Sequence, residues 1–484
     1  MSITTSLFLL PIFKKQQMKT YQLHTSYKQI LADTITPVSV YLKIRDKFPN
    51  SILLESSDYH GNENSFSYIC FNPIAHIEVK DQQIKKAYPD GSNTITPITK
   101  ETNIPEVITA FSKEFTSEKQ DFKFITQGLF GFMTYDAVQY YEDIKISKKE
   151  GGQDLPELYY AVYQNVIAIN HFNNEAYIFA HCYNQPNNVA AIEQLIAVKN
   201  FATYPFKIEG EPSINIKDED YKALVETAKK HCQRGDVFQL VLSRRFTQKF
   251  SGDEFNVYRA LRAVNPSPYL FYFDYGNYKI FGSSPEAQLV VKDQKAEIHP
   301  IAGTFKRTGN DEQDAVLAKE LTEDHKENAE HVMLVDLARN DLSRHGKMVT
   351  VENYREVQFF SHVIHLVSKV TGIKKADTPT MNIVADTFPA GTLSGAPKHK
   401  AMELIEKYEP TPRGYYGGAI GFMDFEGNFN HAIMIRTFLS KDHQLQYQAG
   451  AGIVAASDPE SELQETYNKL GALTKALSLA EDIY

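Results

Sequence analysis

Two acidic residues of this chain lie on the same helical stripe as the apolar residues that follow them. In the segment HKENAEHVMLVDLARND (residues 325–341), Glu327, Glu330, Leu334 and Leu337 are separated by three, four and three positions, so a helix would place them on one face. The leucines predict that this face continues into the protein core. Carboxylates at the start of a buried stripe raise the question of which positively charged group they bind.

A second acidic pair occurs in the last predicted helix, which begins at Pro459. Glu462 and Glu465 share a stripe there with Lys469. Carboxylates from two facing helices would suit Mg²⁺, a hard cation that takes one or two direct carboxylates and keeps several waters. Acids at this spacing also line the solvated faces of ordinary helices, and the pattern alone leaves both interpretations open.

Other segments have features that suit a negatively charged ligand. FPAGTLSGAPK (residues 388–398) contains Gly391 and Gly395 before a helix that opens at Pro397. A glycine-rich turn at a helix N-terminus directs backbone N–H groups at an anion, although a connecting loop explains the same residues. The spacing differs from that of a P-loop.

An arginine in an apolar segment is a further candidate for anion binding. HAIMIRTFL predicts a strand in which Arg436 faces the same side as Met434 and Phe438, and a guanidinium among large apolar groups can bind a carboxylate at two points. Further along, Gly450 and Gly452 end a predicted strand. Their missing side chains would let a ligand approach the backbone, or would form an ordinary bulge.

The elements that must position these residues predict an α+β fold. The N-terminal part has the alternation and turns of short strands, and strands joined by tight turns such as Glu426-Gly427 predict antiparallel hairpins. Helices come in groups and not between every pair of strands, which argues against a doubly wound sheet. Helices are expected over residues 218–234, 254–264, about 312–339, around 355–370, 378–386 and from Pro459 onward.

The chain of 484 residues is too long for one ordinary core. We place a boundary near residue 210, in a polar stretch with Pro and Gly, which gives a part over 18–210 and a part over 211–484. Residues 1–17 are expected to be a disordered extension, with Met18 as a candidate for the true start. They lack the charge order of a secretory signal.

Composition restricts the class of protein. The net charge of -9 and the absence of a basic cluster argue against a nucleic-acid-binding protein. Three scattered cysteines predict neither a disulfide framework nor a cysteine metal site, which fits a cytoplasmic protein, and no segment approaches membrane-spanning length.

Several long segments identify a family. The chain resembles the chorismate-utilising enzymes, and anthranilate synthase component I among them, from about residue 215 to the end and more weakly back to residue 20. The matching segments are PIAGTFKR (300–307), ELTEDHKENAEHVMLVDLARNDL (320–342), VIHLVSKVTG (363–372), FPAGTLSGAPK (388–398), YYGGAIGF (415–422) and GAGIVAASDPESELQET (450–466).

The resemblance implies a fold and a reaction. The fold would be a sandwich of large antiparallel sheets with helices outside. Chorismate and ammonia, with Mg²⁺, would give aminodeoxyisochorismate, which loses pyruvate to yield anthranilate in the first step of tryptophan biosynthesis. Glu330 and Glu465 match the direct Mg²⁺ ligands, and Glu327 and Glu462 match the residues that hold coordinated waters.

The resemblance also assigns substrate and catalytic roles. Positions that match the groups holding the two carboxylates of chorismate are Gly303, Thr304, Tyr416, Arg436, Gly450, Ala451 and Gly452, with Thr392 and Lys469 assisting. Glu286 matches the acid that protonates the departing C4 hydroxyl, and His365 matches a histidine of the pyruvate-eliminating step. Thr304 is a third candidate catalytic residue. Such a dianion needs cationic and N–H partners, and hydroxide leaves only when protonated.

Two positions separate the relatives. Aminodeoxychorismate synthases carry a nucleophilic Lys where this chain has Ala302, and isochorismate and salicylate synthases carry a basic Lys where it has Gln239. Both departures favour anthranilate formation. Aminodeoxychorismate synthase is the alternative within the family, and a non-catalytic tryptophan sensor of the same fold is the alternative outside enzymes.

The resemblance finally implies regulation and a partner. Glu55 and Ser56, with Pro268, Tyr269 and Leu270, match the two halves of a tryptophan-feedback site. One departure is that Ser65-Phe66-Ser67 lacks the arginine usual there. No cysteine lies in a glycine-rich nucleophile turn, so ammonia would come from a separate glutamine amidotransferase, component II, or from solution.

Overall fold

The computed structural model describes residues 19–56, 65–359 and 363–483, apart from the side chains of Thr304 and Lys326. The expected extension over residues 1–17 lies outside these ranges. The elements of the first part are β1 (Tyr21–Leu31), α1 (Pro37–Ile44), β2 (Ile52–Glu55), β3 (Phe66–Lys80), β4 (Gln83–Ala87), β5 (Asn93–Pro97), α2 (Ile104–Lys113), β6 (Phe115–Ser117), β7 (Gly128–Met133), the 3₁₀ helix η1 (Tyr135–Tyr140), β8 (Leu158–Asn170), β9 (Glu175–Cys182), α3 (Val189–Ala197) and β10 (Phe206–Ile214).

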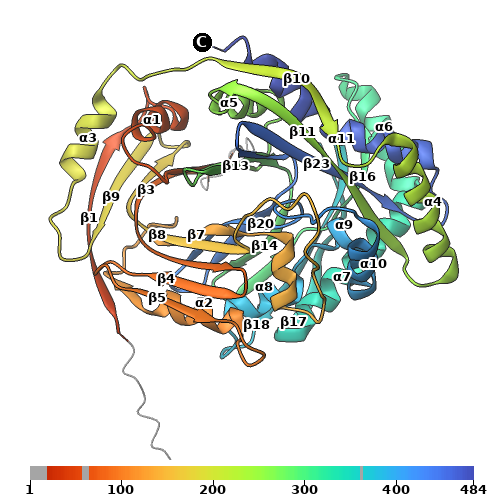
Figure 1. Cartoon of the computed structure of the whole chain (residues 1–484), viewed down its shortest axis with the longest axis horizontal. Helices are drawn as coiled ribbons and strands as arrows, with labels where there is room; N and C mark the ends of the chain where they lie inside the picture. Colours follow the sequence, from red (N-terminus) through yellow and green to blue (C-terminus); the bar gives the residue numbers. More distant parts are fainter. Residues whose placement is uncertain (1–18, 57–64, 360–362, 484) are drawn as a thin grey trace, which may run out of the picture.

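The second part continues the same pattern of strands and grouped helices (Figure 1). Its elements are α4 (Asp218–Arg234), β11 (Gln239–Gly252), α5 (Phe255–Val264), β12 (Tyr269–Asp274), β13 (Tyr278–Ser284), β14 (Ala287–Lys292), β15 (Lys295–Ile298), β16 (Ile301–Lys306), α6 (Asp311–Glu323), α7 (His325–His345), β17 (Gly346–Phe359), β18 (Val363–Lys374), α8 (Thr380–Thr387), α9 (Gly391–Ser394), β19 (Gly395–Ala396), α10 (Lys398–Tyr408), β20 (Ala419–Asp424), β21 (Phe429–Ile433), β22 (Thr437–Lys441), β23 (Gln444–Ile453) and α11 (Pro459–Ala480).

Strand pairing is antiparallel in the described part of the chain except between β1 and β6. The two parts on either side of residue 210 share sheets, since β2 pairs with β12 and β7 pairs with β20. The predicted α+β class is therefore confirmed. None of the described helices is long and apolar enough to cross a membrane.

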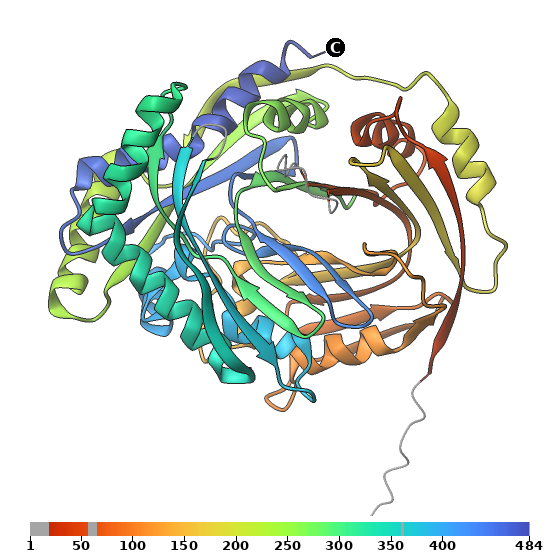
Figure 2. The same cartoon turned by 180° about the vertical axis from the view of Figure 1, so that it is seen from behind.

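The alternation of side chains along the strands produces a sandwich. In β12, Leu270 and Tyr272 face a core that includes residues of α1, α5 and α11, whereas Phe271 and Phe273 face an inner core that they share with Phe130 of β7. Successive side chains of a strand point to opposite faces, so each sheet contributes to an inner and an outer core. Helices cover the outer cores, as the view from behind shows (Figure 2).

Most predicted helices are confirmed, but the helix expected over about 312–339 is two helices. Asp324 has extended backbone angles between α6 and α7, and its side chain accepts a hydrogen bond from the backbone N–H of Glu327. It therefore acts as the N-cap of α7. The sequence around Asp324 has no Gly or Pro to mark this break.

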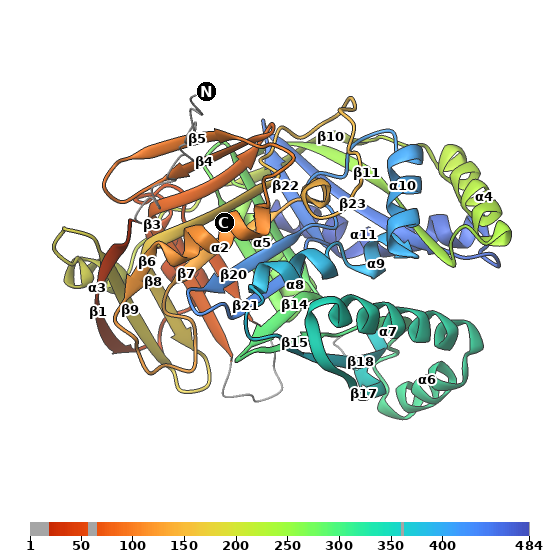
Figure 3. The same ribbon diagram turned by 90° about the horizontal axis from the view of Figure 1, so that it is seen from below.

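Three other predicted elements are wrong in type. The helix expected around 355–370 is the hairpin of β17 and β18, which packs beside α6 and α7 along one side of the molecule (Figure 3). The segment GLFGFMTYDAVQYYEDI (residues 128–144) also predicts a strand followed by an amphipathic helix, but that helix is the short 3₁₀ helix η1. The polar stretch around residue 210 contains the edge strand β10, which pairs with β11.

Candidate active site

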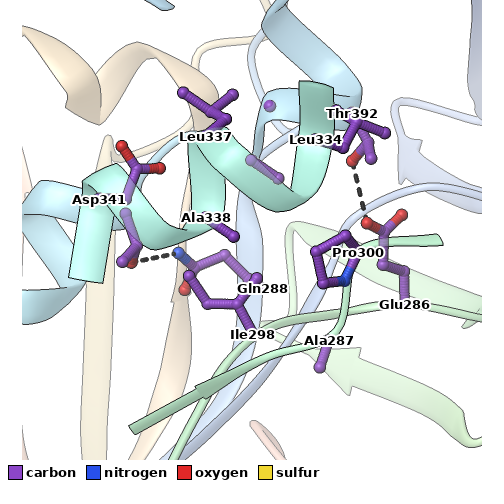
Figure 4. A pocket seen from close by; sticks show the side chains of 13 residues that line it. Glu286, Ala287, Gln288, Ile298, Pro300, Leu334, Leu337, Ala338, Asp341 and Thr392 are labelled. Atoms are coloured by element: carbon purple, nitrogen blue, oxygen red, sulfur yellow. Dashed lines mark hydrogen bonds between the residues drawn. The ribbon is translucent and has the colours of Figure 1, made fainter. Parts of the chain in front are cut away.

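Glu286 is a buried acid in the segment between β13 and β14. It is 9% exposed, and the Thr392 hydroxyl, at the start of α9, donates a hydrogen bond of 3.0 Å to its Oε1 (Figure 4). Burial raises the pKa of Glu286 to about 8, against the smaller lowering effects of the Thr392 hydrogen bond and the Lys469 charge. The group is therefore mainly protonated at neutral pH and suited to donate a proton.

Lys469 brings the last helix to the end of β23. Its Nζ lies 2.6 Å from Glu465 Oε1 and donates a hydrogen bond of 2.9 Å to the backbone carbonyl of Gly450. The stripe of Glu465 and Lys469 predicted on α11 is thus confirmed, and it faces the predicted glycine positions.

Arg436 reaches the same place, although the strand predicted around it is wrong. β21 ends at Ile433 and β22 begins at Thr437, and Arg436 lies in the bend between them with a positive φ of 51°. Its Nη1 donates to the backbone carbonyl of Lys469 at 2.7 Å. Burial lowers the pKa of Arg436, while the nearby Tyr416 and Glu465 raise it, so an anion bound here would supply favourable charge.

His365 and Gly303 face each other across β16 and β18. His365 Nδ1 lies 2.8 Å from the backbone carbonyl of Gly303, which can only accept, so Nδ1 carries the proton. Burial is the main cause that lowers the pKa of His365, and the charge of Arg436 adds to it, so the ring is neutral at pH 7 and Nε2 has the acceptor character of a base. Thr304 pairs with His365 in the ladder, and its side chain lies outside the described residues.

The acidic pair of α7 also lies against these strands. Gln239 Nε2, at the start of β11, donates a hydrogen bond of 2.6 Å to Glu330 Oε1. A side chain added at Gly452 would lie 3.6 Å from that Glu330 oxygen, and one at Gly303 would lie 3.3 Å from a Glu327 oxygen. The carboxylates of α7 thus point to the two glycine positions predicted for substrate binding.

The acids of α11 complete the arrangement. Glu462 is 4% exposed and Glu465 is partly buried, so neither points simply into bulk water. Glu330 lies close to Gly452. Lys469, the ion-pair partner of Glu465, contacts Gly450, two residues away on the same strand. Among the described residues, no three His, Cys, Asp or Glu side chains form a cluster that could hold a metal. A Mg²⁺ ion held by one or two carboxylates and waters does not need such a cluster.

The remaining predicted substrate residues are close by. Tyr416 is 3% exposed in the turn before β20, and the Arg413 guanidinium carbon lies 5.8 Å from the centre of its ring. Ala451 is fully buried between the two glycines of β23. His331 is structural, as its Nε2 lies 2.6 Å from the Ser368 hydroxyl.

The five residues predicted for tryptophan binding line one separate cavity of about 210 Å³. Glu55 and Ser56 follow from β2, while Pro268, Tyr269 and Leu270 precede or begin β12. Aromatic side chains form much of the remaining wall: Phe66, Tyr68, Phe271 and Phe422. The Glu55 carboxylate accepts hydrogen bonds from the Tyr258 hydroxyl at 2.6 Å and from Arg262 Nε at 3.0 Å.

Comparison with known proteins identifies the family of this chain. The model of the chorismate binding enzyme family matches residues 50–475. This chain belongs to the chorismate binding enzyme family. Anthranilate synthase component 1 of Aquifex aeolicus is 36% identical over 96% of both chains, and that of Lactococcus lactis is 37% identical over 93% of this chain and 98% of the relative.

Solved structures of chorismate binding enzymes share the fold. Anthranilate synthase component I from Streptococcus pneumoniae has a TM-score of 0.74 and 31% identity, covering 92% of this chain and 99% of that one. The menaquinone-specific isochorismate synthase of Escherichia coli has a TM-score of 0.71, with 96% of each chain covered. At 18% identity, that second likeness supports the fold alone.

Sequence reasoning missed buried charged groups near this candidate site. Arg413 and Glu409 form a buried ion pair of 2.7 Å, and Arg413 Nη2 also donates to the carbonyl of Val241 at 2.8 Å. Lys398 and Asp341 form a second buried pair of 2.6 Å. Glu409 and Arg413 are four residues apart, a spacing that could have suggested a pair, but nothing in the sequence marked it as buried.

Proposed function

We propose that this chain is the large subunit of anthranilate synthase, which converts chorismate and ammonia to anthranilate and pyruvate through aminodeoxyisochorismate. The observation that carries the proposal is the convergence of Glu286, Lys469, Arg436 and His365 on the glycines of β23 and β16. The curated relatives, at 34% to 37% identity over nearly the full length, support it independently.

Arg436 and the glycine backbone would bind the substrate carboxylates. Arg436 is partly buried and lies beside Tyr416, and the nearby backbone lacks side chains at Gly450, Gly452 and Gly303. Because the site is partly shielded from solvent, a guanidinium and backbone N–H groups bind a carboxylate strongly there. This arrangement would hold the ring of a dicarboxylate between α7, α11 and the sheet.

Glu286 would act as the general acid. Its carboxyl group is protonated at neutral pH because burial raises its pKa to about 8, so it can give its proton to the C4 hydroxyl as that group departs as water. Thr392 orients the carboxyl group through its hydrogen bond. His365, neutral and with its Nδ1 proton directed to Gly303, would take the proton that is removed in the pyruvate-eliminating step.

The oxygen ligands of α7 and α11 are suited to Mg²⁺. Glu330 and Glu465 would hold the ion directly, and Glu327 and Glu462 would hold its waters, because a hard cation prefers carboxylate oxygens. When bound, the ion would supply positive charge to a substrate carboxylate. In the structure Gln239 and Lys469 occupy the two direct ligands, so these partners would have to shift on binding.

The nucleophile would be ammonia supplied by a component II amidotransferase. Gln239 is a neutral amide and Ala302 is a buried alanine in β16, so neither position offers an amine for activating water or for forming a covalent adduct. These two residues favour direct attack by ammonia over the aminodeoxychorismate alternative.

The cavity beside β2 and β12 would take tryptophan as a feedback inhibitor. Its volume of about 210 Å³ is smaller than the roughly 300–1,000 Å³ of drug-sized sites and suits a single aromatic amino acid. Stacking on Phe66, Tyr68 or Phe422 would hold an indole ring, and Ser56 and Asn430 offer hydrogen bonds. Titration with tryptophan would test this role: an unchanged rate at saturating tryptophan would remove it.

The direct test mixes the pure chain with chorismate, ammonium and Mg²⁺ and follows anthranilate fluorescence. Formation of aminodeoxychorismate would favour the alternative enzyme, and no consumption of chorismate would favour the non-catalytic sensor. Removal of Mg²⁺ with EDTA should abolish turnover, and Glu465→Gln should nearly abolish it. Glu101→Gln, which changes an exposed acid in the N-terminal part, is the matched control and should keep full activity.

A further inference from the structure

A small cavity lies behind Glu286, between β14, α7 and the segment from α8 to α9 (Figure 4). Leu334 and Leu337 of α7 form part of its wall, and Glu286, Gln288 and Asp341 are its acidic and amide groups. Its volume of about 30 Å³ is enough for about two water molecules, each of which needs roughly 10–15 Å³. A dry cavity of this kind would be lined by apolar groups alone.

Gln288 presents an acceptor that the described part of the chain leaves without a partner. Its side chain is 3% exposed, its Nε2 donates to the Thr387 hydroxyl at 3.0 Å, and no described group donates to its Oε1. A buried acceptor without a donor costs about 1–3 kcal/mol, so a bound molecule with a hydrogen to donate is expected there.

The orientation of this amide is fixed by its neighbour. The Thr387 hydroxyl has one proton and directs it to the backbone carbonyls of Ile383 at 2.9 Å and Val384 at 3.2 Å. Toward Gln288 it can therefore only accept, and the amide nitrogen must face it. Exchange of the amide nitrogen and oxygen would break this bond, so Oε1 remains the acceptor that needs a donor.

The acids around the cavity are already oriented. Asp341 accepts from Lys398 at 2.6 Å, and Glu286 accepts from Thr392 at 3.0 Å. Asp341, which is paired with Lys398, lines the cavity on this side, and the charge of Lys469 acts on Glu286 from the α11 side. A molecule here must donate to Gln288 and is able to accept from a protonated carboxyl group.

We propose that a short file of about two waters fills this cavity from Gln288 Oε1 to the carboxyl group of Glu286, and that Gln288 is a positioning residue for that acid. Each water donates toward Gln288, so the last one accepts the proton of Glu286. This direction stabilises the protonated acid in the free protein. When the substrate binds, the carboxyl O–H turns from the last water to the C4 oxygen and gives its proton there. The inference rests on the role proposed for Glu286, but the waters themselves do not.

A crystal structure that resolves ordered solvent tests the waters directly. We expect one water within about 3.2 Å of Gln288 Oε1 and continuous hydrogen bonding to Glu286. Gln288→Met, which removes the acceptor but keeps the length of the side chain, should remove that water. A cavity without solvent density, or a protein donor on Gln288 Oε1, would overturn the inference whether or not the chain makes anthranilate.

The pH dependence of kcat/KM, which reports the pKa of Glu286 in the free protein, tests the positioning role. Gln288→Met should move the alkaline limb to lower pH by on the order of one pH unit, about tenfold in kcat/KM on that limb. Gln288→Glu keeps an oxygen acceptor and adds negative charge, so it should move the limb to higher pH. If the alkaline limb of the pH profile is unchanged in both Gln288 variants, the positioning role is contradicted. An amide with only a structural role would lower activity without moving that limb.

Gln127→Met is the matched control. Gln127 is also a buried amide, 7% exposed, but it lies just before β7 in the N-terminal part. It should leave the pH profile of kcat/KM unchanged. If the chain forms no anthranilate under any condition, the proposed function fails, and the crystallographic test still decides whether the cavity holds water.

Discussion

Glu286→Gln should destroy activity and stabilise the protein. The substitution keeps the shape of a protonated carboxyl group but cannot ionise. At pH 7 the unfolded carboxyl group is ionised and the folded one is protonated, because burial raises its pKa from 4.5 to about 8. Folding at pH 7 therefore requires this carboxyl group to take up a proton. Because pH 7 lies 2.5 units above the unfolded pKa of 4.5, the proton uptake lowers the stability by about 3 kcal/mol, at about 1.4 kcal/mol per pH unit.

The sign of this effect follows from the direction of the shift. A carboxyl group with a raised pKa contributes most to stability below its unfolded pKa of 4.5, and that contribution is lost as the pH rises through about 8. The Gln variant does not titrate. Its advantage in the free energy of unfolding should therefore be near zero below pH 4.5, grow between pH 4.5 and 8, and level off above.

Urea unfolding of both proteins at several pH values measures this difference, and the anthranilate assay measures kcat. Loss of the general acid should lower kcat by about 10²–10⁴-fold. Glu101→Gln, at an exposed site, should show no pH-dependent difference in stability. Equal stability differences at acidic and alkaline pH would refute the argument that burial keeps Glu286 protonated, whatever happens to kcat.

Three other outcomes are expected. Arg413→Met should lower the free energy of unfolding in urea by about 3–5 kcal/mol, because it leaves the buried Glu409 carboxylate unpaired; a loss below 1 kcal/mol would contradict the pairing. His365→Gln should let aminodeoxyisochorismate accumulate, which chromatography would detect; unchanged anthranilate output would rule out this role. Lys469→Met should move the alkaline limb of kcat to higher pH, since the Lys469 charge lowers the pKa of Glu286; a downward shift would show that another group dominates.

The parts of the site that sequence could predict are those with regular spacing or a family motif. The stripe of Glu465 and Lys469 follows from helical periodicity, and the structure forms that ion pair. Arg436 lies among buried or partly buried neighbours, as its apolar segment predicts, but it is not in the predicted strand, because a bend with a positive φ cannot be recognised in an apolar segment of strand-forming residues. Apolar periodicity predicts burial better than it predicts backbone conformation.

Elements determined by distant partners were the least predictable. The hairpin of β17 and β18 was mistaken for a helix because its apolar residues fit either period, and only pairing with β15 and β16 fixes it as a strand. β10 is polar because it is an edge strand that pairs with β11 alone in the described part. Gln288 could not be identified, since its importance comes from Thr387, which lies on another element.

The strand register connects the cavity beside β2 and β12 to the backbone next to Glu286. Tyr269 and Ala432 line that cavity, and their ladder partners are Ser284 and Ala287, which flank Glu286 in the chain. An effector bound in that cavity would distort ladder hydrogen bonds that lie about one strand spacing, roughly 4.8 Å, from the backbone of Glu286. Changes on β2, one strand further out, are thus where effector sensitivity and turnover should be easiest to uncouple.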